Sequence, residues 1–240
     1  MATTLLDLRQ LLGKPGFCGD IILSSFTFAT TSTNAIDSSL GGSDGAYNNG
    51  YLRILQGLAS TNERTIDTWI ASTKKFTPIM NFTAAVSSGN TYELHRQFSP
   101  LDKDAAIQQA IRESGEYWLA QNEDESITLS SATAYSLATI SPTVDRSLGV
   151  KEVRVEPSSS TAEWDKINGD QWYLRDDAGV LYLQFKSSQA SGQKIRIVYD
   201  SRPTIPLVDG TALNPDEPAF IEWILYKASQ ALFQKKADLG

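Results

Sequence analysis

Residues 99–119 read SPLDKDAAIQQAIRESGEYWL, and they are the one mid-chain segment with a clear helical pattern. The opening serine and proline are typical of a helix start, because serine caps free backbone amides and proline suits the first turn. Ile107, Ile111 and Trp118 fall on one face at helical spacing. Short, turn-punctuated runs lie on both sides of this segment, so we expect it to join two β-rich halves.

Helical spacing also occurs near both ends of the chain. Residues 4–12, TLLDLRQLL, place four leucines roughly on one side. Residues 218–237, PAFIEWILYKASQALFQKKA, have a broad apolar face and carry lysines in their C-terminal half, as the helix dipole favours. We predict that the central and C-terminal helices pack as an antiparallel pair. The side chains predicted to meet there are Ile107, Ile111, Trp118, Ile221, Leu225 and Leu232.

Residues 47–98 are predicted to form a small β module. Alternating runs, separated by turn signals such as the Asn-Gly pair at 49–50, are enough for four or five short strands. Pro78 places one run at an edge or a bend, since proline cannot donate to a sheet. His95, the sole histidine, is assigned to an edge strand. Residues 17–34 are expected to form an extended arm or an isolated strand.

Residues 122–205 are predicted to form an antiparallel β-sandwich, because about six short strands at regular spacing are typical of that architecture. The Asn-Gly pair at 168–169 predicts a tight hairpin. Trp164 and Trp172 would then pair across its two strands. The acidic stretch QNEDES, at 121–126, is interpreted as a connector from the central helix.

The predicted fold class is therefore α+β. A small helical core, made by the central and C-terminal helices, carries a small β module and a larger antiparallel β-sandwich. The predicted segments are 1–46 (N-terminal helix, extended arm and loop), 47–98 (small β module), 99–121 (central helix), 122–205 (β-sandwich) and 206–240 (C-terminal helix and tail).

The composition narrows the functional classes. A net charge of −7 argues against a dedicated nucleic-acid binder, which normally presents a basic face. Cys18 is the sole cysteine, so an internal disulfide framework and a multi-cysteine metal site are excluded. No apolar run approaches the length of about 18 residues that a membrane span needs. The N-terminus lacks the pattern of a secretory signal, so we expect a protein made in a cytoplasm with no membrane partner.

Short motifs resembling catalytic signatures lack the context that catalysis needs. Gly41–Gly45 matches the G-x-S-x-G pattern around Ser43, but a nucleophile elbow follows a strand and precedes a helix, and here a polar loop precedes. Residues 72–75 match S-x-x-K without its companion motifs. The acidic run at 123–125 lacks the spaced oxygen ligands of a calcium loop. We assign no catalytic, cofactor-binding or metal-binding residue, and we expect no enzyme and no cofactor.

The order of the elements resembles that of head-to-tail connector proteins, also called neck or adaptor proteins, of tailed bacteriophages. The likeness spans about residues 47–236 and lies in the order and type of elements. Its quoted stretches are NNGYLRILQG at 48–57, NERTIDTWI at 62–70, GNTYELHRQFSP at 89–100, AAIQQAI at 105–111, VKEVRVEP at 150–157, VLYLQF at 180–185, GQKIRIVY at 192–199 and the closing helix.

The resemblance implies a structural virion protein in the phage neck, assembled in the bacterial host cytoplasm. It implies a homo-oligomeric, dodecameric ring that docks below the portal protein, contacts an adjacent neck or tail protein, and passes DNA without sequence-specific binding. The loop at 35–50 is expected to interlock with neighbours. The candidate subunit or portal interface comprises Trp223, Tyr226, Lys235, Lys236 and Leu239. Many such adaptors are nearly all helical, whereas this chain is richer in strands.

Two alternatives remain open. The first is a β-sandwich binding module, directed at carbohydrate or a receptor or decorating a capsid, with Trp164 and Trp172 as its candidate aromatic platform beside Glu163 and Asp165. The second is a hydrolase built on Ser43, which would need His95 as its base.

Overall fold

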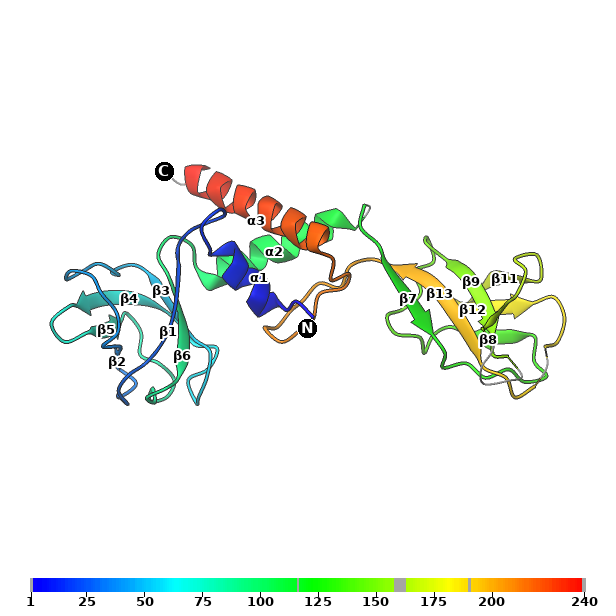
Figure 1. Ribbon diagram of the computed structural model, residues 1–240, viewed down its shortest axis with the longest axis horizontal. Helices are drawn as coiled ribbons and strands as arrows, with labels where there is room; N and C mark the ends of the chain where they lie inside the picture. Colours follow the sequence, from blue (N-terminus) through cyan, green and yellow to red (C-terminus); the bar gives the residue numbers. More distant parts are fainter. Residues whose placement is uncertain (1, 116, 158–162, 190, 239–240) are drawn as a thin grey trace. The chain divides into compact units, whose positions relative to one another are not determined.

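The computed structural model describes residues 2–115, 117–157, 163–189 and 191–238 (Figure 1). The chain divides into two compact units. The first unit combines Met1–Arg112 with Ile205–Gly240, and the second unit is Glu113–Thr204. Three helices and thirteen strands lie in the described residues, and every strand pair is antiparallel. The predicted α+β class is therefore confirmed.

The first unit contains all three helices and a six-stranded sheet of order β1-β6-β3-β4-β5-β2. Its elements are α1 (Leu5–Leu12), β1 (Ile21–Ser25), β2 (Ala35–Ile36), β3 (Tyr51–Ile54), β4 (Glu63–Ile70), β5 (Lys75–Pro78), β6 (Thr91–His95), α2 (Pro100–Ser114) and α3 (Pro218–Asp238). A register shift near Ile66 on β4 places Trp69, rather than Ile70, in the aromatic core beside Phe76.

The second unit is a sandwich of two antiparallel sheets. One sheet has the order β10-β9-β13-β7 and the other has the order β11-β12-β8. Their strands are β7 (Ala120–Asp124), β8 (Ala134–Ser136), β9 (Val150–Val155), β10 (Asp165–Lys166), β11 (Trp172–Asp177), β12 (Val180–Phe185) and β13 (Ile195–Ser201). Inward-facing residues such as Leu183, Ile195 and Ile197 are fully buried between the sheets. Ile195 and Ile197 are two residues apart, as alternation in a strand requires of side chains on one face.

The central and C-terminal helices run antiparallel, as predicted, but α1 is the helix that makes the more extensive backbone contact with α3. The Ser99 hydroxyl accepts a hydrogen bond from the Asp102 amide and so caps α2. The Lys235 ammonium, in the last turn of α3, lies 2.6 Å from the Asp102 carboxylate in the first turn of α2. Figure 1 shows α2 and α3 running in opposite directions. An antiparallel arrangement requires this meeting of one helix start with the other helix end.

The predicted helical face needs two corrections. Ile107, Leu225 and Leu232 are buried as expected. Trp118 lies beyond α2, which ends at Ser114 because a glycine follows and glycine is a poor helix residue. Ile221 is only half-buried, and Phe220 and Ile224 are the fully buried residues in that part of α3.

The expected N-terminal arm is part of the β module. Within 17–34, strand β1 pairs along its length with β6, and Phe26 is buried against Tyr92. Because β6 therefore lies between β1 and β3, His95 is on an interior strand and the predicted edge position is wrong. Periodicity identified the strands but not their neighbours, since pairing depends on contacts distant in sequence.

The loop at 35–50 packs closely onto the same module. Asp37 is fully buried, and its carboxylate accepts hydrogen bonds from the hydroxyls of Ser24 and Tyr92. The Tyr47 hydroxyl donates to the Gly41 carbonyl at 2.7 Å. These contacts give the loop a fixed conformation within the first unit.

Two further predictions about the second unit are wrong. The stretch at 121–126 was interpreted as a connector, but most of it forms β7, which pairs with β13. The Asn-Gly pair at 168–169 was expected to close a hairpin, but β10 pairs with β9 while β11 pairs with β12. Trp164, which precedes β10, and Trp172, the first residue of β11, therefore lie next to and within different sheets and form no cross-strand pair.

Candidate functional site

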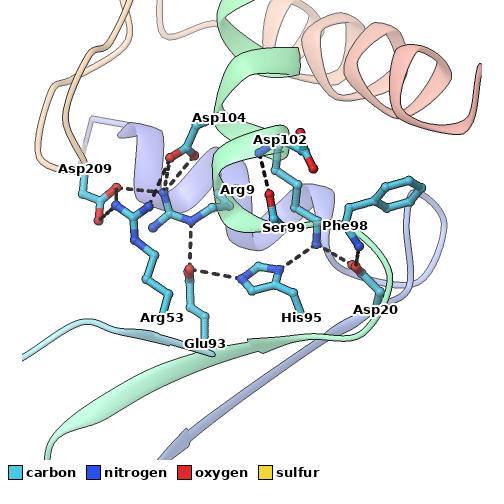
Figure 2. Close-up of polar contacts among 11 residues, drawn as sticks. Arg9, Asp20, Arg53, Glu93, His95, Phe98, Ser99, Asp102, Asp104 and Asp209 are labelled. Carbon is cyan, nitrogen blue, oxygen red and sulfur yellow. Dashed lines mark hydrogen bonds and ion pairs between the residues drawn. The ribbon is translucent and has the colours of Figure 1, made fainter. Parts of the chain in front are cut away.

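The most concentrated polar chemistry of the first unit is a buried charge network beneath its helices (Figure 2). Four helix or strand elements and two connections contribute to it. Its members are Arg9 of α1, Arg53 of β3, Glu93 and His95 of β6, Lys103 and Asp104 of α2, Asp20 before β1, and Asp209 before α3.

Arg9 is the centre of one half of this network. The capping box of Thr4 and Asp7 fixes the start of α1, and the leucine face of that helix turns Arg9 into the interior. The fully buried Arg9 guanidinium donates from Nε to Glu93 at 2.8 Å, and from Nη1 to Asp104 and Asp209 at 2.8 Å each. One side chain thus joins α1 to the sheet, to α2 and to the segment before α3.

Arg53, on the neighbouring strand β3, belongs to the same half of the network. Its Nη2 atom lies 3.1 and 3.0 Å from the two oxygens of Asp209, and its Nη1 atom lies 3.4 Å from Asp104. Both carboxylates are thereby shared between two guanidinium groups. Such paired contacts with arginine are stronger than single neutral hydrogen bonds.

His95 and Lys103 form the other half. The Lys103 ammonium lies 2.8 Å from His95 Nδ1 and also pairs with the Asp20 carboxylate. Because an ammonium can only donate, His95 Nδ1 accepts and its Nε2–H donates to Glu93 at 3.3 Å. Asp20 also accepts the backbone amide of Phe98, which fixes the connection from β6 to α2.

The network holds its members in defined charge states. Burial lowers the pKa of His95, the Lys103 charge adds to this effect, and the imidazole is therefore neutral. Burial opposes ionisation of Glu93, but the hydrogen bond from His95 and the Arg9 charge outweigh it and lower the pKa of Glu93. Burial dominates at Asp104 and raises its pKa despite Arg9.

This arrangement suits a structural role. Each side chain of the network except Asp209 is nearly inaccessible to solvent, so no substrate can approach Glu93, His95 or Lys103 directly. Removing one partner of a buried ion pair leaves an uncompensated charge and costs about 3–5 kcal/mol. The network therefore fixes α1, α2 and the segment before α3 on the β module.

Sequence reasoning did not identify the network, although three signals were present. Lys103 and Asp104 precede Ile107 by four and three positions, so a helix places them on the same buried face. Glu93 and His95 are two apart in a strand and face the same side of the sheet. Arg9 gave the same helical signal, because it follows Leu5 by four positions and precedes Leu12 by three, which places it on the buried leucine face of α1.

The structure does not assemble the hydrolase residues. Ser43 is exposed in a polar turn. His95 is fully buried, with its ring nitrogens engaged by Glu93 and Lys103, so it cannot act as a base for Ser43. Cys18 is a packed thiol, as expected, and burial raises its pKa to about 11.

The two candidate tryptophans have different environments. Trp172 is half-buried against the sandwich core. Trp164 lies in an open hollow of about 560 Å³, where the Arg196 guanidinium stacks 4.4 Å from the ring centroid. Glu163 lines the same hollow, and Asp165 is exposed in β10. Only Trp164 of the two therefore remains a candidate contact residue.

The residues of the predicted interface on α3 are partly engaged within the chain. Tyr226 is 61% exposed, whereas Trp223 is half-buried with the Lys227 ammonium 5.9 Å from its ring centroid. Lys235 pairs with Asp102, and Lys236 donates to the Gln97 side chain at 3.1 Å. Leu239 lies outside the described residues.

A metal site and a membrane-spanning helix are both absent from the described residues. Within them, no cluster of histidine, cysteine and carboxylate side chains could hold a metal ion. No described helix is long and apolar enough to cross a membrane. Comparison of the chain with protein-family models, with curated proteins and with solved structures finds no match.

Proposed function

We propose that this chain is a structural virion protein of a tailed bacteriophage, a head-to-tail connector without catalytic activity. In this role it forms a ring below the portal protein, extends the DNA channel and joins the tail. The element order that resembles connector proteins supports the proposal, and each of its quoted strand and helix stretches overlaps a β-strand or an α-helix of the fold.

One observation carries the proposal. In the first unit the clustered charged side chains are buried, whereas the surface of α3 exposes aromatic side chains. The charge network is internal and positions helices, as an assembly component requires. Meanwhile α3 exposes Tyr226 by 61% and Phe233 by 44%, and the Phe233 ring also contacts Phe98 at a centroid distance of 5.3 Å. Exposed aromatic side chains are enriched at protein interfaces because they bury a large area at low entropic cost.

The partners follow from this role. They are the portal protein, an adjacent neck or tail protein, and further copies of the chain in a dodecameric ring. DNA would pass through the ring without sequence-specific binding. The net charge of −7 suits a conduit, because strong attraction to phosphates would slow the passage of DNA. The location is the neck of the virion, assembled in the bacterial host cytoplasm.

Negative-stain microscopy of the purified protein, alone and mixed with its portal protein, tests the proposal. We expect rings, or portals capped by an added ring. The Tyr226→Ser variant should lower the fraction of capped portals, whereas Tyr173→Ser, at an exposed tyrosine of the second unit, should leave it unchanged. A monodisperse monomer that ignores the portal would refute the proposal.

The hollow around Trp164 supports a second candidate, a β-sandwich module that binds carbohydrate or a receptor. An aromatic ring beside charged side chains is typical of sugar-binding sites, and this hollow also contains Arg154 and Lys166. Glycan-array binding that is lost on Trp164→Ala would favour this candidate. Absence of binding to every glycan would count against it.

A further inference from the structure

The first unit of this acidic protein has a group of exposed cations at one place. Lys14, Arg96, Lys235 and Lys236 are all exposed, and we call these four residues the basic corner. Lys14 belongs to the turn between α1 and β1, and Arg96 to the connection between β6 and α2. Lys235 and Lys236 are in the last turn of α3.

Hydrogen bonds place these three segments side by side. The Gly19 amide donates to the Lys14 carbonyl at 3.1 Å, and the Arg96 amide donates to the Asp20 carbonyl at 3.0 Å. Lys236 reaches Gln97, the residue after Arg96, at 3.1 Å. The basic corner is therefore one continuous surface rather than four scattered charges.

Two hollows flank Gln97 within this surface. One, of about 390 Å³, is lined by Arg96, Asn48, Gln97, Gly19 and Gly50, and also by Asp20, which pairs with Lys103. The other, of about 170 Å³, is lined by Lys235 and Lys236, and also by Asp102, which pairs with Lys235. Both carboxylates already have a lysine partner within the chain, so the Arg96 guanidinium is left to donate hydrogen bonds to an incoming carboxylate.

Two of the four cations have no internal counter-charge. Among the described residues, Lys14 and Arg96 make no side-chain hydrogen bond or ion pair, whereas Lys235 pairs with Asp102. The second unit is the more acidic of the two. Residues 113–204 contain nine lysines and arginines and fourteen acids, which gives a charge of −5.

Three acids of the second unit that make no ion pair within the described structure lie close together in sequence. Glu163, Asp165 and Asp170 are exposed, and none of the three makes an ion pair among the described residues. By contrast, Asp176 and Asp177 pair with Arg146 and Arg175. The segment 163–170 therefore presents three carboxylates without an ion pair in the described part of the chain, although Lys166 lies between them in sequence and Arg154 and Arg196 line the same hollow as Glu163.

We propose that the basic corner of one copy of this chain binds Glu163, Asp165 and Asp170 in the second unit of a neighbouring copy. The inference rests on the proposed function only in that copies of the chain assemble. Copies that each carry −7 repel one another, so a contact between them requires local charge complementarity. The basic corner and the segment 163–170 provide it.

A charge-swap experiment on the full chain tests this contact. Arg96→Glu and Asp170→Arg should each weaken self-association about tenfold to a hundredfold, measured by sedimentation velocity over a range of concentrations. The double variant, which restores opposite charges, should recover most of the wild-type association. Lys75→Glu, which makes the same charge change on β5, should have little effect. Circular dichroism checks that each variant is folded.

Three other outcomes would contradict the proposed contact or the connector proposal. If Arg96→Glu and Asp170→Arg associate as the wild type does, the basic corner is not the contact, while the connector proposal stands. If the wild type stays monomeric with and without its portal protein, both proposals fail. If Arg96→Glu leaves assembly intact but abolishes retention on double-stranded DNA, the basic corner contacts phosphates and this inference is overturned.

Discussion

Replacing Arg9 by methionine should destabilise the first unit strongly. The substitution keeps a similar side-chain volume but removes the guanidinium that contacts Glu93, Asp104 and Asp209. The latter two carboxylates retain Arg53 at 3.4 and 3.0 Å. Glu93, fully buried, retains only the hydrogen bond from His95. We therefore expect a loss of about 3–5 kcal/mol, the cost of one uncompensated buried charge.

Hydrogen exchange followed by mass spectrometry can measure this loss in each unit separately. Peptides from α1, β6 and α2 should exchange about a hundredfold to a few thousandfold faster in Arg9→Met, because each 1.4 kcal/mol is about a factor of ten. Peptides from the second unit should not change. Lys235→Met breaks an ion pair whose partners are exposed at 59% and 38%, so exchange in this variant should stay close to that of the wild type.

A second substitution separates the buried charge from the lost packing. In Arg9→Met with Glu93→Leu, the carboxylate is removed together with its partner, so much of the lost stability should return. Two results would contradict this account. One is that Arg9→Met lowers the free energy of unfolding no more than Lys235→Met does. The other is that the double variant, Arg9→Met with Glu93→Leu, is less stable than Arg9→Met alone.

Three further predictions concern single side chains. Burial lowers the pKa of His95, so the unfolded chain binds a proton below about pH 6.5 that the folded chain does not. The free energy of unfolding of the first unit should therefore fall as the pH drops below about 6.5, and the fall should be smaller in His95→Gln. Burial raises the pKa of Cys18 to about 11, so iodoacetamide should label the native thiol far more slowly at pH 8 than the urea-unfolded thiol; equal rates would contradict the packing. Trp172→Ala should destabilise the second unit by about 2 kcal/mol or more, and Trp164→Ala by less than about 1 kcal/mol, as measured by urea unfolding.

The sequence predicted features that depend on local periodicity. The α+β class and the cap at Ser99 follow from patterns within single elements. The position of His95 did not, because an interior strand differs from an edge strand only through its neighbours. The pairing of Trp164 with Trp172 failed for the same reason, since an Asn-Gly turn does not require both flanking strands to join one sheet.

The charge network was harder to predict than the apolar core. Lysine and aspartate in a helix are normally exposed, so Lys103 and Asp104 are expected to face water. They are buried because Asp20 and Arg9 arrive from segments more than eighty residues away in sequence. Only tertiary structure supplies these counter-charges. Ionisable residues on an otherwise apolar helix face are thus a signal of a buried partner.

The most direct test of the connector proposal is electron microscopy of a phage whose copy of this gene is disabled. We predict that lysates contain DNA-filled heads and complete tails that are not joined, and that wild-type protein supplied in trans restores joined particles. The charge-swapped double variant, Arg96→Glu with Asp170→Arg, should also restore them. Normal joined particles in the absence of the protein would contradict the central claim.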